Sequence, residues 1–193
     1  MGIFSEFSDP DYKEKNHVFL SLCETEPGII SAGGYSSNIY RINKKTKTSQ
    51  AFPYNLLSSN FARPDKYIRS IIKDSGGDIW IGGYYNLRRI TNSNNSSTIF
   101  QDFENITVIH EKDKDSLWIG SSTGLYQLDK RSGNYMRIDL PTVSSYVYSL
   151  CHTDDDKLYI GTNGSGLLIY DITEKTFTNY HTNNSSLISN NIY

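Results

Sequence analysis

Four segments of the chain share one pattern of apolar and polar positions. Each segment opens with a short apolar run and reaches a glycine about fourteen residues later, as from Ile68 to Gly82 and from Val147 to Gly161. The four glycines stand at positions 33, 82, 120 and 161, so neighbouring repeats are 38 to 49 residues apart. This period is typical of a repeat that forms one four-stranded blade of a β-propeller.

The pattern inside one repeat predicts four strands. Residues 68–72 form an apolar, β-rich run that ends at the polar turn 74–77, and the run 79–81 is apolar on both of its faces. A strand of the second kind is buried between neighbouring sheets. A third run follows at 87–90, and a more polar segment with aromatic residues at 100–103 fits the outer edge of a sheet.

Repetition divides the whole chain into consecutive blades. The beginning of the chain is similar to the end of a repeat, and its last residues are similar to the start of one. We therefore expect an all-β fold, a β-propeller of four-stranded antiparallel blades, present as an incomplete arc of about four blades plus partial blades at both ends. The expected ranges are an outer strand of a preceding blade with a linker at 1–16, blades at 17–55, 56–103, 104–141 and 142–182, and a linker with the start of a next inner strand at 183–193.

Composition agrees with strands and narrows the class of protein. The 193 residues include 15 tyrosines but only three alanines, and aromatic side chains suit a pleated sheet. A formal net charge of −2 argues against a strongly basic nucleic-acid binder. No run approaches the roughly 20 apolar residues of a membrane-spanning helix, so we expect no membrane contact by this segment.

Three of the repeats resemble a known family. The segments Ile79-Trp-Ile-Gly-Gly83, Leu117-Trp-Ile-Gly-Ser-Ser-Thr-Gly-Leu-Tyr126 and Leu158-Tyr-Ile-Gly-Thr-Asn-Gly-Ser-Gly-Leu167 are similar to the two-component regulator propeller repeat. The resemblance extends over residues 17–190. It implies the periplasmic sensor region of a hybrid two-component histidine kinase of gut Bacteroidetes, which detects an oligosaccharide and relays the signal to a kinase. The kinase itself has no counterpart in this sequence, so we expect this chain not to be an enzyme.

The loops that follow the repeat glycines hold the candidate ligand residues. These loops share one face of a propeller, and their sequences diverge between repeats. Aromatic rings and amide groups suit a concave sugar site. The predicted ligand-binding residues are Tyr35, Tyr84, Tyr85, Asn86 and Asn163.

Other chemically suggestive residues have plainer explanations. Trp80 and Trp118 occupy matching positions in the apolar second run, which favours packing between blades over a sugar platform. Cys23 and Cys151 also match in repeat position, and we expect both to be buried free thiols. The aspartates of the hairpin turns lack the spacing of a calcium loop. We therefore predict no catalytic residues, no metal site and no cofactor.

Two alternative functions remain open at this point. A propeller lyase or glycosidase would need paired acid–base groups on the loop face. The four loops after the repeat glycines contain no Asp or Glu, but the loops between blades hold Asp65 and Glu104, which keep this alternative open. A protein-interaction platform would show a large exposed patch instead of a small pocket. An open arc also predicts two further kinds of partner, namely the missing blades of the same parent chain and a second copy bound through the open blade edges.

Overall fold

The computed structural model describes residues 18–36, 38–53, 67–94, 96–100, 103–142 and 144–193. Over these residues the protein consists of sixteen strands and contains no helix. The strands form four separate sheets of four strands each, and every neighbouring pair is antiparallel.

Each sheet is built from four consecutive strands, so each repeat of the sequence closes into one blade. The first sheet contains β1 (Phe19–Glu26), β2 (Ile29–Gly34), β3 (Asn38–Asn43) and β4 (Thr48–Pro53). The second contains β5 (Ile68–Lys73), β6 (Ile79–Gly83), β7 (Leu87–Ile90) and β8 (Ser97–Phe100).

The third and fourth sheets repeat the same order. The third sheet contains β9 (Ile106–Asp113), β10 (Ser116–Ser121), β11 (Gly124–Asp129) and β12 (Tyr135–Ile138). The fourth contains β13 (Val147–Thr153), β14 (Lys157–Thr162), β15 (Leu167–Asp171) and β16 (Thr176–Tyr180).

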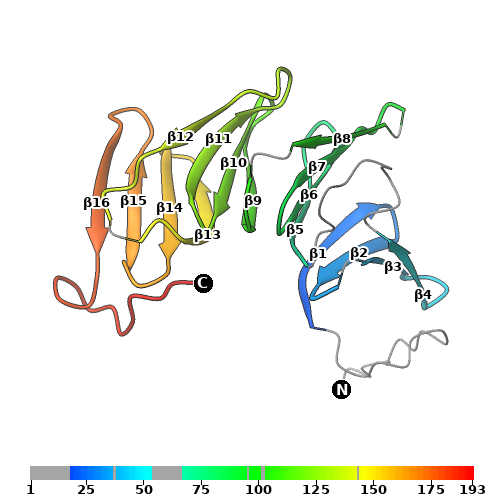
Figure 1. The fold of residues 1–193 in the computed structure, drawn as a ribbon, viewed down its shortest axis with the longest axis horizontal. Helices are drawn as coiled ribbons and strands as arrows, with labels where there is room; N and C mark the ends of the chain where they lie inside the picture. Colours follow the sequence, from blue (N-terminus) through cyan, green and yellow to red (C-terminus); the bar gives the residue numbers. More distant parts are fainter. Residues whose placement is uncertain (1–17, 37, 54–66, 95, 101–102, 143) are drawn as a thin grey trace.

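The sheets follow one another along an arc that does not close (Figure 1). Their first strands lie on the inside of the arc, where β1 contacts β5, β5 contacts β9, and β9 contacts β13. The predicted fold class, an unclosed arc of four-stranded antiparallel propeller blades, is confirmed. The outer strand predicted within 1–16 lies outside the described residues.

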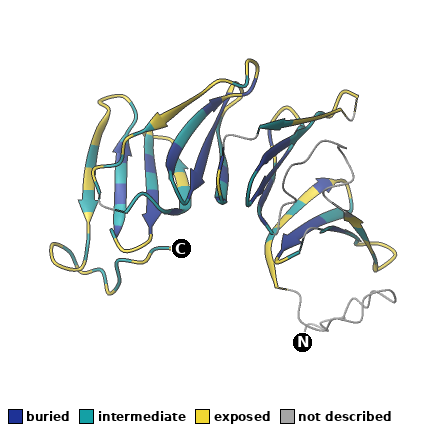
Figure 2. Ribbon diagram, viewed as in Figure 1, coloured by how far each residue is buried: buried dark blue, intermediate teal, exposed yellow. Residues whose placement is uncertain are grey.

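The hydrophobic core lies between the sheets. Trp80 and Leu87 of the second sheet pack against Ile106 and Ile119 of the third, and Trp118 of the third packs against the fourth. Both tryptophans are almost completely buried, as predicted. Buried residues concentrate on the second and third strands of the sheets, while turns and outer strands are more exposed (Figure 2). Each blade is therefore stabilised mainly by the blade beside it.

The repeat glycines allow this close approach. A Cβ atom added at Gly82 would lie 2.5 Å from Cγ2 of Ile106, the first residue of the next inner strand. At Gly120 the added atom would lie 2.6 Å from Cγ1 of Val147, the corresponding residue one blade further on. Because any larger residue would clash there, the glycine marks the point where consecutive blades meet.

One cysteine prediction is wrong. Cys23 is half-buried and packs near the core between the first and second sheets, whereas Cys151 is exposed. Cys151 pairs with Tyr159, which occupies the position of Trp80 and Trp118. In the second and third sheets, the following blade covers the face that carries this tryptophan. No sheet follows the fourth in the described chain, so the same face of the fourth sheet leaves Cys151 exposed.

Every first strand carries a β-bulge near its beginning. The register shifts between Phe19 and Ser21 in β1, between Ile68 and Ser70 in β5, and between Val147 and Ser149 in β13. In the third sheet the shift leaves Thr107 of β9 without a partner in β10. A bulge leaves one residue unpaired and turns its side chain away from the regular alternation. The four unpaired positions are Leu20, Arg69, Thr107 and Tyr148.

Candidate functional site

In the first, third and fourth blades, the loop after the second strand is hydrogen-bonded to the residue that precedes the first strand. The backbone N–H of Tyr35 donates to the carbonyl of Val18 (3.1 Å), and that of Asn163 donates to the carbonyl of Tyr146 (3.0 Å). Contacts also cross between blades, because the N–H of Asn105 donates to the carbonyl of Tyr84. These bonds join the loops of successive blades into one surface, which we call the loop face.

Four tyrosines form a chain of ring contacts on the loop face. Tyr35 meets Tyr67 with ring centroids 5.6 Å apart, Tyr67 meets Tyr84 at 5.1 Å, and Tyr84 meets Tyr85 at 4.5 Å. All three contacts are close to perpendicular, the edge-to-face geometry that aromatic pairs prefer. We call Tyr35, Tyr67, Tyr84 and Tyr85 the tyrosine belt. It spans the first two blades, and Tyr35 at one end is 54% exposed.

A second aromatic cluster lies at the fourth blade. Tyr146 and Tyr148 have ring centroids 4.7 Å apart, and Tyr148 lies 4.6 Å from Tyr193. Asn105 connects this cluster to the belt, since its backbone binds Tyr84 while its side-chain Nδ2 donates to the hydroxyl of Tyr146 (2.8 Å). The loop face is therefore continuous from the first blade to the fourth.

Asn105 also leaves one polar atom available. Its side-chain oxygen Oδ1 is buried and accepts no hydrogen bond from any residue that the structure describes. The residue has a positive φ of 47°, a conformation that asparagine tolerates better than most residues. A buried acceptor without a donor is costly, so a donor from a bound molecule would be stabilising at this position.

The structure brings some of the predicted ligand residues together and separates others. Tyr35, Tyr84 and Tyr85 meet in the tyrosine belt through Tyr67. Asn163 is exposed at the other end of the loop face, beside the backbone of Tyr146. Asn86 is only 3% exposed, and its carbonyl accepts the N–H of Gly83, so it shapes its own loop.

Several residues of the loop face were not predicted from the sequence. Tyr67, Asn105 and Tyr146 each stand one position before the first residue of an aligned inner run. That shared repeat position is a signal that would have found them. Tyr148 and Arg69 lie at the bulges, which a simple alternation of side chains does not reveal.

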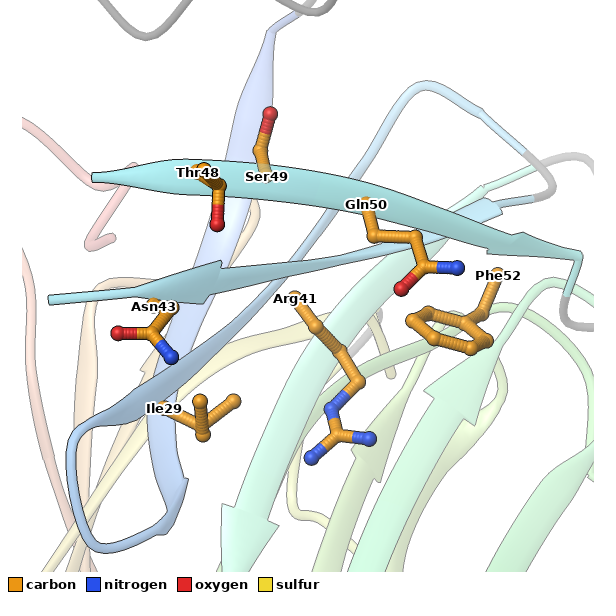
Figure 3. A pocket seen from close by; sticks show the side chains of 7 residues that line it. All are labelled: Ile29, Arg41, Asn43, Thr48, Ser49, Gln50 and Phe52. Carbon is orange, nitrogen blue, oxygen red and sulfur yellow. The ribbon is translucent and has the colours of Figure 1, made fainter. Parts of the chain in front are cut away.

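A separate pocket of about 230 Å³ lies on the first sheet (Figure 3). It is lined by residues of β2, β3 and β4, among them Ile29, Arg41, Gln50 and Phe52. The Arg41 guanidinium lies 5.6 Å from the centre of the Phe52 ring and donates to the carboxylate of Glu26 at 2.5 Å. Because the charge of Arg41 is already paired, this pocket offers a ligand less than the loop face does.

A histidine pair joins the third and fourth blades away from these residues. The backbone N–H of His152 donates to Nε2 of His110 at 3.4 Å, and the two ring centroids are 6.4 Å apart. Burial lowers the pKa of His110, and the neighbouring His152 lowers it further. The described residues contain no cluster of three His, Cys, Asp or Glu side chains that could hold a metal ion.

The fold and the loop face define a β-propeller arc with an aromatic, amide-bearing surface across its blades. Residues 62–85, which include the second repeat up to Tyr85, match the model of the family described as two component regulator propeller. The resemblance to that family is therefore confirmed. Among curated proteins, none is similar enough in sequence to match.

Solved structures with the same fold include domains of this kind of regulator. The extracellular domain of BT3049 from B. thetaiotaomicron, described as a hybrid two component system, superposes with a TM-score of 0.71 at 18% identity, over 86% of this chain and 25% of that one. The extracellular domain of BT4673 from the same organism, described as a one component system, gives a TM-score of 0.72 at 18% identity, over 96% of this chain and 25% of that one. A streptogramin B lyase gives 0.67 at 18% identity, over 84% and 54%. At these identities the likeness shows the fold alone.

The chain spans about a quarter of the length of the two extracellular domains. Within the described residues, no helix has the length and apolar character needed to cross a lipid bilayer.

Proposed function

We propose that this chain is part of the extracytoplasmic sensor region of a two-component system and that its loop face binds an oligosaccharide. The observation that carries the proposal is the continuous surface of tyrosines and amides across four blades, in a chain that contains a two-component regulator propeller repeat. Tyrosine rings offer flat apolar faces with a polar tip, and amides donate and accept hydrogen bonds. Sugar rings present the complementary mixture of C–H faces and hydroxyl groups.

Signal relay follows from the position of the site. A ligand that touches loops of several blades binds best to one relative arrangement of those blades, and a ligand shifts an equilibrium by its difference in affinity between states. In this proposal the change in blade arrangement on ligand binding alters the activity of a kinase that lies outside this chain. The chain itself catalyses no reaction. The four loops contain no Asp or Glu, which supports binding over lyase or glycosidase chemistry.

The test is an oligosaccharide array followed by calorimetric titration of the best probe. Tyr67→Ala should weaken binding by about tenfold, since Tyr67 contacts two other rings of the belt and its loss breaks the aromatic surface. Tyr135→Ala is the matched control, because Tyr135 lies on the outer strand β12 beside the turn at the opposite end of its sheet. Absence of any binding oligosaccharide, or equal losses in both variants, would contradict the proposal.

A second candidate function, a protein-interaction platform, is favoured by one observation. The apolar side chains of Phe19, Leu20 and Leu22 on β1 are exposed, with Leu22 at 64%. We propose that another propeller blade covers this edge, supplied by the parent chain or by a second copy. If association through this edge were the main function, Leu22→Lys would alter the assembly measured by sedimentation velocity, and no oligosaccharide on the array would bind.

A further inference from the structure

Arg69 is the one charged side chain among the four bulge positions of the inner strands. The others are Leu20, Thr107 and Tyr148. The hydroxyl of Thr107 is used within the fold, since it donates to the carbonyls of Gly120 and Val147. Arg69 thus differs from its repeat equivalents in carrying a cation to a position that the fold itself does not require to be charged.

Arg69 faces residues of the loop face. Its guanidinium carbon lies 5.5 Å from the centre of the Tyr67 ring, within the range of a cation–π contact. It also lies close enough to Tyr148 to affect that hydroxyl: burial and the neighbouring tyrosines raise the pKa of Tyr148, while the positive charge of Arg69 opposes them. Arg69 therefore lies against the tyrosine belt, and its charge acts on the second aromatic cluster.

The charge of Arg69 is not neutralised by any carboxylate of the described residues. The ion pairs of these residues use other cations. Its Nε is buried and makes no hydrogen bond within the described part of the chain. By contrast, Arg41 is paired with Glu26 and Arg89 with Asp78. A buried N–H donor of a cation that lacks an acceptor is costly, and an anionic ligand would relieve that cost.

We infer that the oligosaccharide bound at the loop face is acidic, and that Arg69 pairs with its carboxylate or sulfate group. This inference rests on the proposed function and narrows it to a substrate class. The planar guanidinium presents parallel N–H groups that match two oxygens of either anion. The sugar ring next to the anion would lie against Tyr67, and the unpaired oxygen of Asn105 would accept a hydrogen bond from a sugar hydroxyl.

The experiment compares charged and neutral forms of the same probes on the 193-residue chain. One pair is trigalacturonic acid and its methyl ester, and the other is a sulfated galactan tetrasaccharide and its desulfated form. We expect the acidic member of at least one pair to bind about tenfold more tightly, a factor that corresponds to 1.4 kcal/mol. The pair that shows the preference identifies the anion as carboxylate or sulfate.

Three variants test the role of Arg69. Arg69→Gln should remove the preference for the acidic probe while the affinity for the neutral probe changes less than about twofold. Arg69→Lys keeps the charge but loses the planar fork, so it should keep part of the preference. Arg131→Gln removes a positive charge from the exposed turn between β11 and β12 and should leave the preference intact. Circular dichroism spectra and thermal unfolding curves of all variants verify that they fold.

The outcomes separate this inference from the proposed function. Equal binding of acidic and neutral probes, or a preference that survives Arg69→Gln, overturns the inference but leaves an oligosaccharide sensor in place. Absence of binding to every saccharide on the array overturns both.

Discussion

At the scale of single residues, Asp74 shows how one side chain joins two blades. Its carboxylate is almost fully buried, accepts the indole N–H of Trp80 at 2.9 Å and lies 3.1 Å from Nζ of Lys130 in the next blade. Lys130 also pairs with Glu111. Burial by itself raises the pKa of Asp74, but the bonds from Trp80 and Lys130 outweigh it, so the pKa lies below its usual value.

A lowered pKa makes Asp74 a source of acid sensitivity. The stabilisation is complete above the pKa of an unfolded aspartate, about 3.9, and is lost as the pH falls through the lower pKa of the folded state. We expect Asp74→Asn to lower the free energy of unfolding at pH 7 by about 3 kcal/mol, because it leaves Lys130 buried without this partner. The variant should then lose less further stability than the wild type between pH 5 and pH 2.

Urea denaturation at several pH values measures the free energy of unfolding of the wild type and of Asp74→Asn. Asp115→Asn is the control, since the carboxylate of Asp115 is exposed in a turn and lies 3.9 Å from Nζ of Lys114. We expect its free energy of unfolding to change by less than about 0.5 kcal/mol. Identical acid profiles for the wild type and Asp74→Asn would refute the assignment.

At the scale of strands and loops, the contact between each repeat glycine and the next inner strand sets how closely two blades approach. Gly82 touches Ile106 in this way. We expect Gly82→Ala to lower the free energy of unfolding by about 1–3 kcal/mol, because the added methyl group forces the two blades apart.

Gly76→Ala provides the comparison for that substitution. Gly76 lies in an exposed turn, where an added Cβ would meet only one side-chain oxygen at 3.3 Å. Chemical denaturation should show that Gly76→Ala changes the free energy of unfolding by less than about 1 kcal/mol. A Gly82→Ala protein as stable as Gly76→Ala would show that the blades can separate without cost.

The same scale explains which features the sequence could predict. Strands and hairpin turns depend on neighbouring residues, so alternation and the Asp/Gly turns located them. Tyr35, Tyr84 and Tyr85 were singled out because they lie in loops that differ between repeats, and their role in ligand binding stays a prediction. Tyr67 and Asn105 were missed because their place on the loop face depends on contacts with residues distant in the chain. Arg69 was missed because its position depends on a register shift, and the exposure of Cys151 because it depends on the absence of a following sheet.

At the scale of the whole molecule, stability is shared between neighbouring sheets. The second and third sheets each pack against a sheet on both sides, whereas the first and fourth each pack against only one sheet among the described residues. In repeat proteins of this kind, stability is close to a sum of repeat and interface contributions. The arc should therefore open from its ends.

Hydrogen exchange measured by mass spectrometry tests this order. We expect the amides of β6 and β10 to exchange more slowly than those of β2 and β14, because opening a central sheet breaks two interfaces. Equal exchange in all four second strands would show instead that the arc unfolds as one cooperative unit.

The glycine contacts also bear on how such arcs tolerate change in length. The pairs Gly33 with Ile68, Gly82 with Ile106 and Gly120 with Val147 make the same contact across different lengths of intervening chain. Insertions in outer strands and linkers therefore leave the pitch from blade to blade unchanged. At each of these three junctions the alignment of the loop face is set by one glycine and one branched residue, so the loops can diversify independently of it.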